Sequence, residues 1–199
     1  MEPVTLTTPR LLLDTFTPED VDAVFEACQD AAVQRWTTVP VPYGREHAES
    51  FVLRMAPDGW HHETEFTFAV RGPGGGTPMG AASVRHPRPG YWEVGYWMGA
   101  RHRGAGYTAE TVSALARWAF TELGCHRLDW LAEVGNTASL GTARRAGFTL
   151  EGVQRAALSN NGTLRDCWRA SLLPSDLGLP TPVPYLPAPR VTASPDPAA

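Results

Sequence analysis

Two periods of hydrophobic and polar residues run along the chain and predict both strands and helices. Apolar residues at every second position predict strands, and spacings of three and four predict helices. The first pattern is clear in Glu65–Arg71 and Tyr91–Met98, and the second in 104–123. The predicted strands cover 10–14, 65–71, 79–85, 91–98, 128–134, 147–153 and 166–173, and the predicted helices begin at Thr17 and cover 45–55, 104–123 and 136–146.

The order of these elements predicts the fold class. Three strands between 65 and 98 are joined by short Gly- and Pro-containing loops, which is typical of an antiparallel meander. A strand–helix–strand unit follows, and Asn161-Gly162 indicates a final hairpin. We therefore expect an α/β (α+β) domain with a mixed, mostly antiparallel central sheet flanked by helices.

The composition changes near Leu173. Eight prolines fall between Pro174 and Ala199, so we expect this stretch to form neither helix nor central strand and to favour an extended polyproline conformation. The expected organisation is a domain over 1–173 and a Pro-rich tail over 174–199. The tail either lies on the surface or is disordered, or it forms an arm that reaches a partner subunit through Tyr185 and Leu186. The sequence leaves a homodimer open.

Charge and cysteine usage exclude several classes of chemistry. The 17 basic residues are all arginines and the net charge is −4. Without lysine there is no Schiff base and no phosphate-loop lysine, and without a basic tract no nucleic-acid partner is expected. The three cysteines form no CxxC pair, so neither a disulfide framework nor a metal site is predicted. No signal peptide or membrane span is visible, which predicts a cytoplasmic protein with no membrane partner.

The segment Tyr91–Glu110 has the composition of an anion cradle. A strand ends at Met98-Gly99, a turn rich in Arg and Gly follows, and an amphipathic helix begins. Free amides at a helix N-terminus, close backbone approach at glycines and arginine side chains all favour a phosphate. The glycine spacing alone would favour the alternative, a strand-to-helix turn that binds nothing. A dinucleotide fingerprint is a weaker interpretation, because Gly104-Ala105-Gly106 is not followed by the third glycine.

Several segments together resemble the GNAT superfamily of acyl-CoA-dependent N-acyltransferases. They are Arg101–Gly106 (the [Q/R]-x-x-G-x-[G/A] pattern), His126–Leu128, Asn136–Ser139, Arg145–Gly152, Thr8–Leu13, and Arg165–Trp168 with Leu172-Leu173. The combination resembles the branch that contains ribosomal-protein N-terminal acetyltransferases and covers Leu6 to Leu173. It implies the GNAT fold, in which the sheet splays at an acyl-CoA cleft.

The resemblance also implies a cofactor-binding set, with acetyl-CoA or another acyl-CoA as co-substrate and no metal. The pantetheine arm would contact the end of the strand, the pyrophosphate would lie on the turn and the helix start, and the next helix would supply an asparagine, a serine and an arginine for the 3′-phosphate. The implied residues are Trp97, Met98, Gly99, Arg101, His102, Arg103, Gly104, Ala105, Gly106, Tyr107, Thr108, Asn136, Ser139 and Arg145.

Three residues are catalytic candidates. Glu93 lies on the strand beside the expected acyl site and is the first candidate for the general base, with a solvated or ion-paired strand residue as the equal alternative. Ser139 is a candidate general acid for the leaving thiolate, and Asn136 would contact the cofactor arm. Strand periodicity puts Glu93, Gly95 and Trp97 on one face.

The acceptor is left open by the sequence. The resemblance favours a protein N-terminal amine. The alternatives are a small-molecule amine, such as an antibiotic or polyamine, and a non-catalytic acyl-CoA-binding module. Where the family commonly has arginine, this chain has Asp14, which removes a positive charge near the acceptor side or the sheet edge. The acidic residues Glu46, Glu49, Glu63 and Glu65 would suit a cationic amine. Trp36, Tyr43 and Trp60 are candidate walls of the acceptor pocket.

Overall fold

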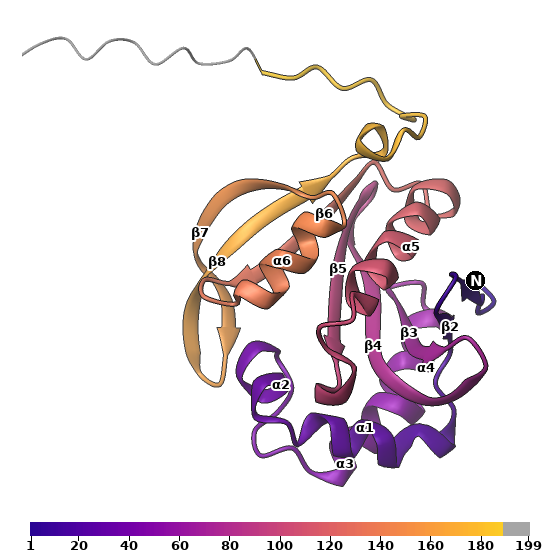
Figure 1. Cartoon of the computed structure of the whole chain (residues 1–199). Coiled ribbons are helices and arrows are strands. Elements are labelled where there is room, and N and C mark those ends of the chain that lie inside the picture. Colours follow the sequence, from indigo (N-terminus) through magenta and orange to yellow (C-terminus); the bar gives the residue numbers. More distant parts are fainter. Residues whose placement is uncertain (189–199) are drawn as a thin grey trace, which may run out of the picture.

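One eight-stranded sheet organises the chain (Figure 1). The structure is a computed structural model that describes residues 1–188. Within these residues the strand order is β1-β2-β3-β4-β5-β6-β8-β7, and only the β5–β6 pair is parallel. The strands are β1 (Leu6–Thr7), β2 (Leu12–Asp14), β3 (Glu65–Gly72), β4 (Gly75–Arg88), β5 (Tyr91–Met98), β6 (Arg127–Glu133), β7 (Thr149–Asn160) and β8 (Thr163–Leu172). This topology confirms the predicted fold class, including the strand–helix–strand unit.

Helices cover both faces of the sheet (Figure 1). They are α1 (Val21–Cys28), α2 (Ala31–Trp36), α3 (Arg45–Ser50), α4 (Ala56–His61), α5 (Tyr107–Glu122) and α6 (Thr137–Arg145), with a π-helical turn at Phe51–Met55 and 3₁₀ turns at Pro18–Asp20, Ala100–His102 and Pro174–Leu177. One core cluster joins α5 and α6 to the sheet face that carries Trp92, Val94 and Met98. A second cluster joins α1 and α3 to the face that carries Trp97. The two faces predicted for β5 are therefore confirmed.

Two parts of the helical pattern differ from the prediction. Helix α2 was not predicted, because six residues are too few to show a helical period. The helix predicted to end at Met55 continues through the π turn into α4 and ends at His61. Pro57 lies directly after the π turn, at the start of α4, where the regular i→i−4 hydrogen-bond pattern is already interrupted.

Three strands are longer than their alternation indicated. β4 begins at Gly75 and ends at Arg88, and β7 runs to Asn160. Register shifts between Leu150 and Gly152 and between Gln154 and Leu158 break the period of β7, and β8 starts at Thr163 because its hairpin partner extends to Asn160. A bulge changes which face successive residues occupy, so the alternation is not visible in the sequence.

The Pro-rich tail is not uniformly extended. Pro174 starts a 3₁₀ turn, where its fixed φ is compatible with the first position, and Leu177 and Leu179 pack against the main core. The expectation that this stretch forms no helix is therefore wrong at its first turn. Tyr185 and Leu186 are exposed, and the arm proposed for them stays a prediction. Residues 189–199 of the tail lie outside the described residues.

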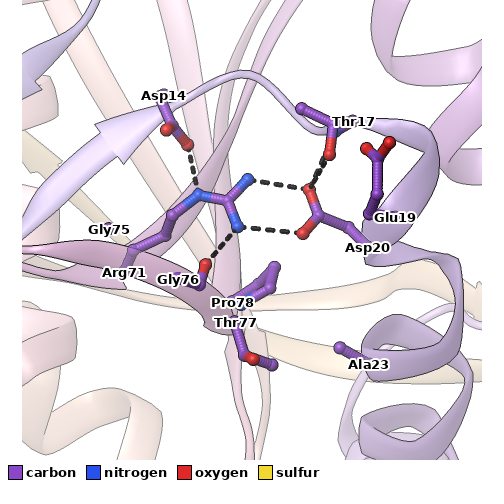
Figure 2. A pocket seen from close by; sticks show the side chains of 10 residues that line it. All are labelled: Asp14, Thr17, Glu19, Asp20, Ala23, Arg71, Gly75, Gly76, Thr77 and Pro78. Atoms are coloured by element: carbon purple, nitrogen blue, oxygen red, sulfur yellow. Dashed lines mark hydrogen bonds and ion pairs between the residues drawn. The ribbon is translucent and has the colours of Figure 1, made fainter.

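Arg71 ties the N-terminal part of the sheet together (Figure 2). Its Nε donates to Asp14 at 2.7 Å, both Nη atoms donate to Asp20 at 2.9 and 2.7 Å, and the guanidinium also reaches the carbonyl oxygens of Thr15 and Gly76. Asp14 thus has a cationic partner inside the chain, and its negative charge is balanced by Arg71. Asp14, Asp20 and Arg71, which all line a surface pocket, are therefore paired with one another.

The environment of Asp20 favours its ionised form. Burial raises the pKa of the Asp20 carboxyl, but the bonds from Arg71 and from the Thr17 backbone outweigh burial, and the pKa is lowered overall. A group with a lowered pKa in the folded state stabilises the protein above its unfolded pKa, about 3.9 for Asp, and this contribution is lost as the pH falls through the folded value.

The replacement Arg71→Met should therefore lower the free energy of unfolding by about 3–5 kcal/mol at pH 7, because two carboxylates lose their partner and one of them is buried. Urea unfolding measures this value. Arg45→Ala removes an exposed arginine that pairs with Asp22 and serves as the control, with no measurable loss of stability.

The Arg71→Met replacement also changes the pH dependence of stability. The loss of stability below about pH 4 should be smaller in this variant than in the wild type, since the pKa of Asp20 is no longer lowered by Arg71. Wild-type stability in Arg71→Met would contradict the assignment.

Candidate functional site

The parallel strands β5 and β6 separate after a short paired section. They pair from Tyr91 to Val94 on β5, opposite Arg127 to Trp130 on β6. Beyond that point Gly95–Met98 still pair with β4, and Leu131–Glu133 still pair with β8. The two unpaired segments border what we call the β5–β6 gap. It lies at the only parallel junction of the sheet in residues 1–188, where the resemblance places the splay.

Backbone groups of β5 face this gap. Gly99 donates to the carbonyl of Met79, so the pair 79/99 is a hydrogen-bonded one. Hydrogen-bonded and non-hydrogen-bonded pairs alternate along antiparallel strands. The next pair, Met98 with Gly80, is therefore a non-hydrogen-bonded one, and the pair after it, Trp97 with Ala81, is hydrogen-bonded again. The N–H and C=O groups of Met98 and Tyr96 therefore point away from β4 and toward the gap. An extended ligand with amide groups can pair with them as an extra strand would.

The predicted anion cradle follows directly. After the 3₁₀ turn at Ala100–His102, Gly104 and Gly106 both have φ of +81°, and α5 starts at Tyr107. The helix therefore begins three residues later than predicted, because left-handed glycines keep 104–106 out of it. Gly106 is the N-cap of α5, so the free amides of the first turn lie beside the end of β5. This geometry suits a phosphate group.

The two cradle arginines differ in their contacts. Arg101 is exposed and takes part in none of the ion pairs found within residues 1–188. Arg103 is engaged: its Nε donates to the Met98 carbonyl at 2.8 Å and its Nη2 donates to Asp30 at 2.7 Å. Arg103 therefore ties the cradle to the end of β5 and to the start of α2. Its direct contact with pyrophosphate stays a prediction.

Ser139 lies in a partly buried group of hydrogen-bonding side chains. Its Oγ is 2.9 Å from the Tyr96 hydroxyl and accepts from Trp130 Nε1 at 3.2 Å, and the same Trp130 N–H lies 3.0 Å from the Tyr96 oxygen. Asn136 caps α6, because its Oδ1 accepts from the Ser139 backbone N–H at 3.2 Å. The side chains of Tyr96, Trp130 and Ser139 come from β5, β6 and α6, so they join the two sides of the β5–β6 gap.

Tyr96 is held in its neutral form. Burial raises the pKa of its phenol, so the hydroxyl stays protonated and can donate to Ser139. When Tyr96 and Trp130 both donate to the Ser139 oxygen, the proton of Ser139 is directed to a third partner. The sequence did not reveal Tyr96 or Trp130 as partners of Ser139, since both have the pattern of core residues in alternating strands.

Glu93 lies on the opposite face of β5, one residue before the last paired position. Arg85 on β4 donates to Glu93 Oε1 through Nε at 3.1 Å and Nη2 at 2.5 Å. Both bonds go to one oxygen, so Oε2 receives neither of them. The side chain is 25% exposed, and Asp129 of β6 lies directly opposite in register. Glu93 is thus an ion-paired strand residue that keeps one accepting oxygen beside the gap.

The unpredicted helix α2 bridges the two sides of the gap. Asp30 caps α2 by accepting from the backbone of Ala32 and Val33, and it also receives Arg103. At the other end Arg35 makes a bidentate pair with Glu133 at 2.6 and 2.7 Å. Glu133 is the last residue of β6 and is buried, and its ion pair with Arg35 lowers its pKa. The helix therefore connects the end of β5 with the end of β6.

The remaining candidates are more dispersed. Arg145 is exposed in the last turn of α6, and its contact with a 3′-phosphate stays a prediction. Tyr43 and Trp60 are buried in the two cores, whereas Trp36 packs under the Arg35 guanidinium at 4.1 Å. The four acidic residues considered for an amine, Glu46, Glu49, Glu63 and Glu65, are spread over α3, the turn after α4 and β3.

The described part of the chain offers no metal site of the usual composition. Among residues 1–188 no group of three or more His, Cys, Asp or Glu side chains is arranged to hold a metal ion. Cys28, Cys125 and Cys167 are buried free thiols. None of the helices in the same range is both long and apolar enough to span a membrane.

The fold and the gap define an acyltransferase architecture, and comparison with known proteins identifies the family. The family model described as Acetyltransferase (GNAT) domain matches residues 10–149. The chain therefore belongs to the GNAT acetyltransferase family and is an acyl-CoA-dependent acetyltransferase.

Individual relatives agree with this assignment. The chain is 29% identical over 174 residues to the uncharacterized N-acetyltransferase YoaA of Bacillus subtilis, covering 81% of this chain and 92% of YoaA. Among solved structures, RimL, the ribosomal L7/L12 alpha-N-protein acetyltransferase in complex with coenzyme A, superposes with a TM-score of 0.75 at 21% identity, covering 86% of this chain and 98% of RimL. The microcin C7 self-immunity acetyltransferase MccE, in complex with acetyl-CoA and AMP, gives 0.75 at 20% identity, with 83% and 93% covered.

The glycine at the start of α5 allows a direct test of the cradle. Gly106→Ala forces a side chain into the left-handed region, at a cost of about 1–2 kcal/mol, and should weaken CoA binding about five- to thirtyfold in calorimetry. Gly124→Ala imposes the same kind of strain beyond the other end of α5, where φ is +60°, and should lower stability without changing CoA affinity. Equal CoA affinities in the two variants would contradict a phosphate site at Gly106.

Proposed function

We propose that this enzyme binds acetyl-CoA along the β5–β6 gap and transfers the acetyl group directly to a primary amine, with a protein N-terminal amine as the acceptor. The observation that carries the proposal is the separation of β5 from β6 after Val94, which turns the backbone groups of Tyr96 and Met98 toward the gap. The RimL structure contains CoA and the MccE structure contains acetyl-CoA, and both share the fold of this chain.

The residues of the gap and cradle fit the chemical groups of CoA. The pantetheine arm has amides that match the free backbone groups of Tyr96 and Met98. The pyrophosphate matches the amides after Gly106 and the exposed guanidinium of Arg101. Since the Met98 carbonyl already accepts from Arg103, the backbone groups left for the arm are the N–H of Met98 and the N–H and C=O of Tyr96. The acyl end would then lie near Ser139 and Glu93.

The side chains around the gap can carry the proton transfers. The amine nitrogen bonds to the acyl carbon as the carbon–sulfur bond breaks, the amine gives up a proton, and the thiolate gains one. Glu93 would receive the first proton through Oε2, directly or through water. Ser139 would supply the second, because Tyr96 and Trp130 can fill its two accepting positions. The mechanism is sequential, with no covalent acyl-enzyme.

Two observations support different acceptors. Structural relatives that act on ribosomal proteins include RimL and the ribosomal-protein-S5-alanine acetyltransferase of Vibrio fischeri, with a TM-score of 0.73. MccE, by contrast, is a microcin C7 self-immunity acetyltransferase whose structure contains AMP, which favours a small molecule as the second candidate acceptor. We favour the protein N-terminus because the sequence resembles that branch over Leu6 to Leu173.

An acceptor panel tests the proposal. Thiol release from acetyl-CoA is measured with peptides that have a free N-terminal amine, with the same peptides blocked by N-acetylation, and with small amines. Turnover on free peptides but not on blocked ones is expected. Turnover on small amines alone would show that the acceptor is a small molecule and not a protein N-terminus. CoA binding without turnover on any amine would show that the protein is a binding module and not an enzyme.

Replacing Glu93 tests the base. Glu93→Gln should lower kcat by about 10²–10⁴-fold and remove the acidic limb of the pH–rate profile, because the amide cannot take up a proton. CoA affinity should stay unchanged. Glu122→Gln, on an exposed site at the end of α5, is the matched control and should behave like the wild type. An unaltered pH profile in Glu93→Gln would assign the base to another group.

A further inference from the structure

Residues far away in the sequence converge on the first turn of α5. Thr8 Oγ1 donates to Glu110 Oε1 at 2.6 Å, and the backbone N–H of Arg10 donates to the same oxygen at 3.2 Å. The Arg10 guanidinium reaches the other oxygen, with Nε at 2.7 Å and Nη2 at 2.6 Å. Both carboxylate oxygens of Glu110 are therefore held by the segment between β1 and β2.

A carboxylate at this place has two opposite effects. In the first turn of a helix a negative charge is favourable to the helix itself, because it faces the positive end of the dipole. It is unfavourable to an anionic ligand at the same helix start. Burial raises the pKa of Glu110, but the bonds from Thr8 and Arg10 outweigh it and lower the pKa overall, so the group is ionised. A pyrophosphate at Gly106 would meet this charge unless it is neutralised.

Arg10 also contacts the cradle itself. Its Nη1 donates to the Ala105 carbonyl at 3.0 Å, and its Cζ lies 4.9 Å from the centre of the Tyr107 ring. Its Nη2 is 3.6 Å from the position that a Cβ on Gly106 would take. The Arg10 side chain thus fixes the Ala105 carbonyl, lies beside Gly106 at the N-cap of α5, and neutralises Glu110 in the first turn of that helix.

We propose that Arg10 is a positioning residue for CoA: it neutralises Glu110 and fixes the Ala105 peptide so that the amides at the start of α5 face the pyrophosphate. The role rests on the proposed function, since it assumes that the cradle binds CoA. It assigns the segment before β2 to the cofactor site, although that segment precedes the cradle by about ninety residues.

A double-mutant cycle tests the role with CoA alone, so no acceptor is needed. Calorimetry gives the CoA affinity and thermal unfolding gives the Tm of wild type, Arg10→Ala, Glu110→Gln and the double variant. Arg10→Ala should weaken CoA binding about five- to tenfold, because it leaves an unpaired carboxylate beside the pyrophosphate. The double variant should recover to within about twofold of the wild type, since the repelling charge is gone and the introduced amide can still accept from Thr8. The remaining loss would come from the Ala105 carbonyl, which has no Arg10 donor in either variant. Arg45→Ala, which breaks an exposed ion pair on α3, is the control and should bind CoA normally.

The cycle separates this role from a merely structural one. If Arg10 only held the fold, the double variant would bind CoA as poorly as Arg10→Ala and its affinity would follow its Tm; that result would overturn the proposal. Wild-type affinity in Arg10→Ala would overturn it as well. Raised salt should reduce the difference between Arg10→Ala and the double variant, because the repulsion is screened. Absence of CoA binding by the wild type would instead contradict the proposed function.

Discussion

The site depends on one constraint, the early end of hydrogen bonding between β5 and β6. Four residue pairs hold the two strands together, and each strand then continues with its other neighbour. Buried backbone groups need partners, so the groups of Tyr96 and Met98 that this separation releases favour a bound chain with amide groups. The same separation makes room for Ser139 of α6 to reach Tyr96 and Trp130, and it places the cradle at the open end.

The width of the gap is fixed from outside the sheet. α2 has only six residues, too few to be stable alone, yet it is ion-paired at both ends. Asp30 receives Arg103 from the cradle, and Arg35 pairs with Glu133 at the end of β6. Since Arg103 also holds the Met98 carbonyl, a movement of either strand end would strain a charge-assisted bond. The ends of β5 and β6 are therefore mechanically linked through one short helix.

Much of the fold was predictable from the sequence, and much less of the site. Period and turn signals predicted the sheet from 65 to 98 and the strand–helix–strand unit, because those strands are buried on at least one face. The full length of β7 was missed because of its bulges, and α2 because of its short length. At the site, Ser139 was a candidate by resemblance alone. Its partners Tyr96 and Trp130 looked like core residues, since a hydrogen bond between side chains from three elements leaves no period in the sequence.

The absence of lysine has a structural side as well as a chemical one. Arg71 donates to two carboxylates and two carbonyl oxygens from three different segments, which the single nitrogen of a lysine could not span. Arg103 bridges a carbonyl and a carboxylate, and Arg127 joins Asp129 to Glu151. In each case the planar guanidinium group fixes the directions of several hydrogen bonds in addition to supplying a positive charge. An exposed pair such as Arg45 with Asp22 does not require several hydrogen bonds in fixed directions. The arginines that matter to this fold are therefore those that connect elements, and Arg10 and Arg103 extend that use to the loop proposed to receive the cofactor.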